Sequence, residues 1–279
     1  MANNLPIHKK ALVLSLITEG QSIRATSRIA GVSQPTILKL IVEAGEKAKN
    51  FHDSMMQGVQ SRFMQVDEIW CYVGCKQKRA IQDDAERGDF YTFIALDADT
   101  KLVPCYRVGK RTARLAASFM MELSVRVNTR FQLSTDAFPA YRDAVDRVFG
   151  AEIDYAQIHK EYREETKGEK RYSPAQIIRV TKKPITGEPI NRHISTSYIE
   201  RQNLTVRMQS RRFTRLTNGF SKKLRNLQAA VDVHFFYYNF IRIHQSLRVT
   251  PAMEAKITNR LWNWIDLLTW DNLAESRVA

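Results

Sequence analysis

The residues with the greatest potential for chemistry are three acids spread far apart along the chain, Asp67, Asp136 and Glu200. Asp67 interrupts an apolar stretch, 63–73, whose composition is typical of a buried β-strand. Asp136 ends a shorter strand-like stretch, and Glu200 lies in 197–212, where the absence of Gly and Pro predicts a helix. A carboxylate among apolar residues is costly unless it meets a cation or a metal. The three acids are therefore candidates for one metal site.

The predicted helix 197–212 has two polar stripes when it is projected at about 100° per residue. The stripe that we expect to face solvent consists of Arg201, Gln202, Thr205, Gln209 and Arg212. The opposite stripe consists of Glu200, Asn203, Arg207 and Arg211, with Leu204 and Met208 on one flank and Ile199 and Val206 on the other. Two interpretations of the second stripe remain open. Glu200 either forms an ion pair within the helix, or ligates a metal while the arginines face phosphate.

The other acids also leave alternatives. Asp136 is either a metal ligand or only the N-cap of a helix that begins near Pro139. Glu68 follows Asp67 directly, and successive side chains of a strand point to opposite faces. We therefore expect Glu68 to have a different role from Asp67.

Composition narrows the class of partner. The formal net charge of the 279 residues is +14, with a pI of about 9.8, which indicates nucleic acid or an anionic membrane surface. No apolar run approaches the 18 residues or so of a membrane span, and no signal-peptide pattern opens the chain, so we expect an intracellular protein that does not enter membranes. Three cysteines cannot build a disulfide framework, and Cys71 and Cys75 lack a second pair for a zinc site.

The first 50 residues predict a helix-turn-helix. Helix-like stretches at 9–18 and 23–30 are followed by a turn at 31–33 and a third helix after Ser33. The last of these helices would enter the major groove of DNA. Its candidate DNA contacts are Gln34, Thr36 and Lys39. The alternative is a small helical bundle that binds protein.

The remaining elements predict an α/β catalytic domain. Three strands, a helix, a strand, a helix, a strand and then the Glu200 helix are the element order of a ribonuclease-H-like, retroviral-integrase-type mixed sheet. Such a sheet can bring Asp67, Asp136 and Glu200 together, and because three carboxylates repel one another, a pair of Mg²⁺ ions is the expected remedy. The expected domains are 1–50 (all-α helix-turn-helix), 51–62 (linker), 63–245 (catalytic, with a charged insertion at 160–192 and a small hairpin around 177–181) and 246–279 (a helical extension). Within the last, Leu261, Trp262, Ile265 and Leu268 form an apolar stripe for docking or subunit contact.

Several motifs resemble the DDE transposases of the Insertion Sequence One family of bacterial mobile elements, over roughly Gln65 to Leu268. They are Asp67-Glu68-Ile69-Trp70, Ser134-Thr135-Asp136-Ala137, Ser197-Tyr198-Ile199-Glu200-Arg201-Gln202-Asn203, the tail from Arg211 to Phe220, Tyr238-Asn239-Phe240, and Ile243 to Met253. The resemblance implies cleavage at element ends and joining of 3′ ends to target DNA, with Asp67, Asp136 and Glu200 as ligands of Mg²⁺, or of Mn²⁺ in its place. Arg207 matches the basic residue that such enzymes place after the glutamate. The implied partners are the terminal inverted repeats, target DNA and further copies of the chain on that DNA. Founding members carry a cysteine-containing zinc motif before the helix-turn-helix, and this chain has none.

A basic segment follows Glu200. Its cations are candidates for phosphate contacts, which position DNA without reading sequence: Arg211, Arg212, Arg215, Lys222 and Lys223. We expect His234 and His244, in an apolar-aromatic stretch, to serve packing. Two other functions stay open, a helix-turn-helix regulator without catalysis and a ribonuclease-H-like nuclease that cleaves without joining strands.

Overall fold

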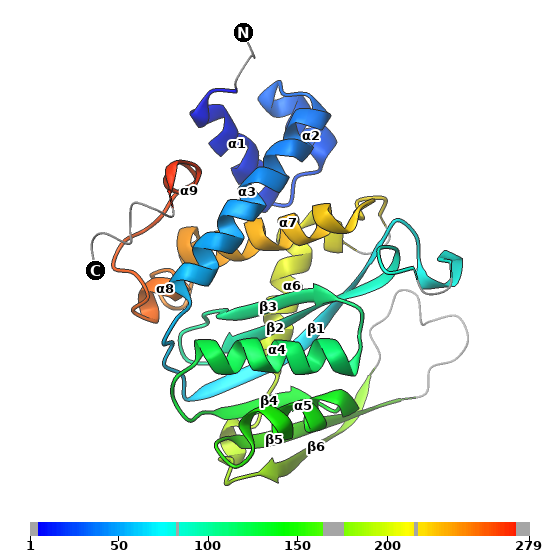
Figure 1. The fold of residues 1–279 in the computed structure, drawn as a ribbon, viewed down its shortest axis with the longest axis vertical. Coiled ribbons are helices and arrows are strands. Elements are labelled where there is room, and N and C mark those ends of the chain that lie inside the picture. Colours follow the sequence, from blue (N-terminus) through cyan, green and yellow to red (C-terminus); the bar gives the residue numbers. More distant parts are fainter. Residues whose placement is uncertain (1–4, 82–83, 164–175, 215–216, 272–279) are drawn as a thin grey trace.

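A mixed β-sheet lies in the lower half of the molecule as drawn, below the N-terminal helices (Figure 1). The computed structural model describes residues 5–81, 84–163, 176–214 and 217–271. Within these ranges six strands lie in the order β3-β2-β1-β4-β5-β6. Their bounds are β1 Phe63–Val73, β2 Gly88–Asp97, β3 Cys105–Gly109, β4 Gln132–Asp136, β5 Asp154–Tyr162 and β6 Ile177–Thr186. β1 is antiparallel to β2 and parallel to β4, and β4 is parallel to β5. This mixed sheet, covered by helices, fits the predicted ribonuclease-H-like arrangement.

Helices cover both faces of the sheet (Figure 1). On one face α4 (Ala113–Arg126) and α5 (Pro139–Phe149) share a core with Met64 and Val66 of β1. On the other face α6 (Ser197–Gln209) packs through Ile199 and Val206. The β1 residues in that second core are Ile69, Cys71 and Val73. The alternation along β1 therefore directs Asp67 toward α6 and Glu68 toward the layer of α4 and α5.

The predicted insertion 160–192 supplies the last strand of the sheet. Residues 164–175 lie outside the described ranges. β6 is longer than the small hairpin expected around 177–181, and it pairs antiparallel with β5 from Tyr155 to Tyr162. The pairing satisfies backbone groups that an unpaired edge would leave open. Part of the charged segment is thus built into the main sheet.

The second and third N-terminal helices begin as predicted, and the first begins at Ile7, two residues before its predicted start. They are α1 (Ile7–Thr18), α2 (Ile23–Ala30) and α3 (Gln34–Met55). The side chain of Ser22 accepts a hydrogen bond from the Ala25 amide, and Ser33 accepts one from the Thr36 amide, so both predicted N-caps are present. α3 extends to Met55, so the first five residues of the expected linker 51–62 are helical.

The end of α3 is anchored by the C-terminal part of the chain. The ring of Phe51 is fully buried, with ring centroids 4.9 Å from Phe240, 4.6 Å from Trp262 and 5.2 Å from Trp270. The C-terminal elements are α7 (Leu224–Phe236), a π-helical turn (Tyr237–Ile241), α8 (Pro251–Glu254) and α9 (Trp264–Thr269). Short 3₁₀ turns lie at Gln77–Arg79, Asn191–His193 and Arg211–Phe213. The stripe expected for docking is divided, because Leu261 and Ile265 are exposed while Trp262 is buried. No helix of the described ranges is long and apolar enough to cross a membrane.

Gly45 allows α3 and α7 to pack closely. A Cβ at this position would lie 2.6 Å from the Ala229 Cα, which is far inside van der Waals contact. Gly45→Ala is expected to destabilise the protein by about 1–3 kcal/mol, although alanine improves helix propensity by up to about 1 kcal/mol, because overpacking outweighs that gain. Urea denaturation measures the difference. Asn50→Ala, at an exposed position of the same helix, is the control and should cause no comparable loss. A Gly45→Ala protein as stable as the wild type would contradict close packing of α3 on α7.

Candidate active site

Asp67, Asp136 and Glu200 line one cavity of about 490 Å³. The parallel register of β1 and β4 ends at the pair Val66 and Thr135, so Asp67 and Asp136 follow side by side where the two strands separate. Glu200 approaches from the first turn of α6. The structure therefore places the three acids that the sequence singled out around one cavity. Among the described residues, however, the carboxylates whose oxygens lie within 4.8 Å of one another are those of Asp67, Glu68 and Asp136, and Glu200 is not in that group.

Asp136 does not serve as the N-cap of α5. The N-cap is Phe138, and no side chain caps it. One oxygen of Asp136, Oδ1, accepts a hydrogen bond from the Phe138 amide at 3.0 Å, and the other lies 3.6 Å from the Arg111 guanidinium. One oxygen of the Asp136 carboxylate thus supports the turn into α5, and the other oxygen faces Arg111.

Glu200 is held by two neighbours. Thr196 Oγ1 donates a hydrogen bond to Glu200 Oε1 at 2.5 Å. The Lys160 ammonium, from the carboxyl end of β5, also donates to that oxygen. No ion pair between Glu200 and another residue of α6 is found among the described contacts. Lys160 is instead its cationic partner, and it lines the same cavity.

Glu68 corrects the expectation that the two adjacent acids act separately. One carboxylate oxygen each from Asp67, Glu68 and Asp136 lies within 4.8 Å of the others. The two side chains do leave β1 toward opposite layers, as expected. β4 ends at Asp136, however, so beyond that point no neighbouring strand separates the longer Glu68 side chain from Asp136. Arg111 Nε donates to Glu68 at 3.0 Å and balances part of the charge.

Burial and neighbouring acids raise the pKa values of Asp67 and Glu68. Burial, followed by the charge of Asp136, raises the pKa of Asp67 to about 6. The same two causes raise the pKa of Glu68 to about 7, and only 3% of its side chain is exposed. Ionising these groups together is unfavourable unless a cation enters. Carboxylate oxygens at this separation are the hard donors that Mg²⁺ prefers, so the residues present fit a magnesium site.

Asn203 and Arg207, which share the predicted stripe with Glu200, lie in different environments. Asn203 is buried and donates its side-chain amide to Asp67 Oδ2 at 2.9 Å, which fixes the carboxylate. Arg207 is not among the described residues that line the acidic cavity. Its charge is felt by the thiol of Cys71, four residues beyond Asp67 on β1, where it lowers a pKa that burial raises to about 12.

α6 presents a different face to solvent from the one predicted. Gln202 and Gln209, expected outside, are 3% and 7% exposed, whereas Leu204 and Met208 are 45% and 67% exposed. The orientation follows from the sheet, since the side-chain oxygen of Gln65 accepts the Tyr198 and Ile199 amides at the start of the helix. The buried face is therefore centred on Val206 rather than on the Leu204 flank.

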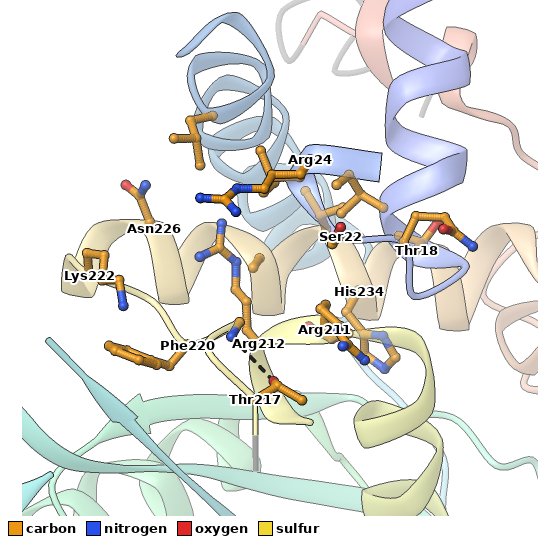
Figure 2. Close-up of a pocket in the computed structure, with 18 of the residues that line it drawn as sticks. Thr18, Ser22, Arg24, Arg211, Arg212, Thr217, Phe220, Lys222, Asn226 and His234 are labelled. Carbon is orange, nitrogen blue, oxygen red and sulfur yellow. Dashed lines mark hydrogen bonds between the residues drawn. The ribbon is translucent and has the colours of Figure 1, made fainter. Parts of the chain in front are cut away.

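The predicted DNA contacts fall into two groups. A second cavity, of about 630 Å³, lies between the N-terminal helices and α7 (Figure 2). The predicted contacts that line it are Gln34, Arg211, Arg212, Lys222 and Lys223. Thr36 and Lys39 are exposed on α3 outside it, and Lys39 lies 3.6 Å from Glu43. Arg215 lies outside the described ranges.

Sequence reasoning missed Lys160, Glu68 and Arg111. A signal was available for two of them. Lys160 lies two residues after Ile158, the last apolar residue of a strand that had to lie beside the Asp136 strand. Glu68 adjoins Asp67 where β1 extends past the end of β4. Arg111 precedes α4 and has no comparable signal in sequence.

Asp67→Asn is expected to stabilise the metal-free protein above about pH 6. Between its ordinary pKa of 3.8 and about 6, Asp67 keeps in the folded state a proton that it has lost in the unfolded state. Stability therefore falls as pH rises through this window, and the loss is complete above it. Asparagine does not ionise, and the gain should be on the order of 1 kcal/mol at about pH 7.5. The free energies of unfolding of the wild type and of Asp67→Asn are measured by urea denaturation in chelator at about pH 5 and about pH 7.5. If the two proteins differed in stability by the same amount at both pH values, the raised pKa of Asp67 would be contradicted.

No family model and no curated protein matches the chain. Among solved structures the chain is similar to one described as "Crystal structure of the Mos1 Strand Transfer Complex". The identity is 15%, the match covers 53% of this chain and 58% of that chain, and the TM-score is 0.22. The chain thus spans less than two thirds of the solved chain, and a likeness of this extent carries no conclusion about activity.

Proposed function

We propose that the chain is a DNA transposase of the Insertion Sequence One type, which binds element ends, cleaves DNA and joins 3′ ends to target DNA. The observation that carries the proposal is the convergence of Asp67, Asp136 and Glu200, from β1, β4 and α6, on one cavity. The motif resemblance around each of these acids supports the same function. The strongly basic charge is consistent with a polyanionic substrate.

Asp67, Asp136 and Glu200 would hold Mg²⁺, for which Mn²⁺ can substitute, and Glu68 lies close enough to add to the same negative charge. Two bound ions would supply activation of the attacking hydroxyl and neutralisation of charge at the leaving oxygen. The raised pKa values of Asp67 and Glu68 support a site that requires a cation when all its acids are ionised.

Other side chains position these acids. Asn203 holds the Asp67 carboxylate by donating to Oδ2. Thr196 orients Glu200 by donating to Oε1. Lys160 pairs with Glu200, and its ammonium would be close enough to contact a phosphate of bound DNA if Mg²⁺ took its place beside Glu200.

DNA binding would be divided between two surfaces. Gln34, Thr36 and Lys39 would read the element ends from the helix-turn-helix. The basic segment, with Arg211, Arg212, Arg215, Lys222 and Lys223, would hold phosphates of element or target DNA. Arg207 would steady DNA near the acids from the same helix as Glu200. Pairing of two element ends would be served by further copies of the chain.

The test is a strand-transfer reaction with labelled DNA ends of the element and a target plasmid, with Mg²⁺ or with chelator. Joined product only in the presence of Mg²⁺ supports the proposal. Cleavage without joined product would favour a ribonuclease-H-like nuclease. DNA binding with neither reaction would favour a helix-turn-helix regulator.

A further inference from the structure

The 630 Å³ cavity between α2, the start of α3, the segment after α6 and α7 has the size of a small-ligand site (Figure 2). Its walls come from parts of the chain that are far apart in sequence. Arg24 belongs to α2, Arg211 and Arg212 follow α6, Lys222 precedes α7, and His234 belongs to α7.

The residues that line the cavity differ in chemistry. Ile17, Ile23, Leu38 and Val233 are apolar. The cations that line the cavity are Arg24, Arg211, Arg212, Lys222 and Lys223, and the described lining residues include no acid to neutralise them. A lining of apolar residues and uncompensated cations suits a ligand with a flat apolar part and an anionic part.

Several buried polar atoms in the cavity wall have no partner among the described residues. Arg212 Nη1 donates to Ser221 Oγ at 2.8 Å, but the buried Nη2 has no hydrogen-bond partner. Burial lowers the pKa of Arg212 to about 10. Gln209 Oε1 and both ring nitrogens of His234 also lack partners, and these side chains are only 7% and 2% exposed. Native proteins satisfy nearly all such groups, so donors and an acceptor are here available to a ligand.

An aromatic side chain borders the same space. Phe220 lines this cavity and also a neighbouring one, which contains Trp70 and Tyr72. The ring centroids of Tyr72 and Phe220 are 4.4 Å apart, and the Lys222 ammonium lies over the Phe220 ring. A cationic groove beside aromatic rings is the combination that binds unpaired nucleotides.

We propose that this cavity binds a single nucleotide turned out of a DNA strand. Its base would replace the Lys222 ammonium on the Phe220 ring, with Gln209 and His234 reaching the base edge, and Arg212 would hold its phosphate. A free nucleotide has the same chemistry, but Gln34, at the start of the predicted DNA-reading helix, lines the same space and favours a nucleotide that belongs to DNA. The proposal rests on the proposed function for the identity of its DNA and not for its chemistry, since neither the acids nor a metal takes part.

The test compares two duplexes that are identical except for one unpaired thymidine, by fluorescence anisotropy with the full chain in chelator. The wild type is expected to bind the duplex with the unpaired thymidine about tenfold more tightly, because stacking of one base contributes a binding free energy of that size. The unpaired thymidine also has no base pair to break before it leaves the helix. Phe220→Leu, which keeps bulk but removes the aromatic face, should abolish most of this preference. Gln209→Leu and Arg212→Lys should reduce it. Arg147→Ala, which removes an exposed cation of α5, is the matched control and should leave the preference intact.

Two outcomes would overturn the proposal. One is equal affinity of the wild type for both duplexes, or a preference that Phe220→Leu and Gln209→Leu leave unchanged. The other is tight binding of free thymidine monophosphate without any preference for the unpaired thymidine, which would identify a free-nucleotide site. Because chelator prevents strand transfer, a failure here is distinct from a failure of the proposed transposase activity.

Discussion

Asp67→Asn, Asp136→Asn and Glu200→Gln are each expected to lower cleavage and joining by on the order of 10³-fold or more, while affinity for DNA is retained. The reason is the shared cavity, in which all three carboxylates would act on the same metals. Combining two substitutions should cost little beyond either alone, because the first already disables the centre. Single-turnover cleavage with labelled DNA in Mg²⁺ measures the rates, and anisotropy with the same DNA measures binding.

The matched control for this series is Asp143→Asn, at an exposed position of α5. It removes the same charge outside the cavity and should leave the rates unchanged. Substantial cleavage by Asp136→Asn in Mg²⁺ would contradict a catalytic role for Asp136. Its hydrogen bond with the Phe138 amide would then be a role only in the turn before α5.

Replacing Lys222 and Lys223 together by alanine is expected to weaken binding of element-end DNA and random DNA alike. Both lysines are exposed and belong to a segment that no base-reading motif includes. Each lost phosphate contact should make the dependence of log affinity on log salt shallower by about 0.9, so the double variant should change the slope by about 1.8. Salt titrations of affinity on both DNAs provide the measurement.

The control here is Arg142→Ala with Arg147→Ala, which removes two exposed cations from α5. An unchanged salt slope in the lysine variant, or an equal change in the α5 variant, would remove the lysines from the path of DNA. A loss confined to element-end DNA would instead assign them to sequence recognition.

Elements with strong local signals were predictable from sequence. β1 has the predicted bounds, 63–73, because its Val, Ile and aromatic residues followed by a glycine are typical of a buried strand. The caps at Ser22 and Ser33 followed from side chains that compete for the first helical amides. The convergence of Asp67 and Asp136 followed from the element order, which places the two strands side by side.

Features that depend on packing were not predictable. The two polar stripes of α6 are equivalent in a helical projection, and only the bonds from Gln65 and Asn203 decide which one is buried. The partnership of Lys160 with Glu200 requires the register of β5 against β4.

The extent of α3 has an experimental consequence. Its last turn is buried against Phe240, Trp262 and Trp270, so a fragment of residues 1–60 would expose Phe51 and its neighbours. Recognition by Gln34, Thr36 and Lys39 is therefore best measured in the full chain. Lys39→Ala is expected to weaken binding to element ends more than binding to random DNA.

The most direct measurement of the central claim is a titration of Mn²⁺ into the full chain bound to element-end DNA, followed by electron paramagnetic resonance. If Asp67, Asp136 and Glu200 form one metal centre, the wild type should bind two ions at this site, and Glu200→Gln or Asp136→Asn should lose at least one of them. Lowering the pH through about 7 and then 6 should also weaken binding, as Glu68 and Asp67 become protonated. Equal Mn²⁺ binding by the wild type and by both variants would contradict a metal centre built from these acids.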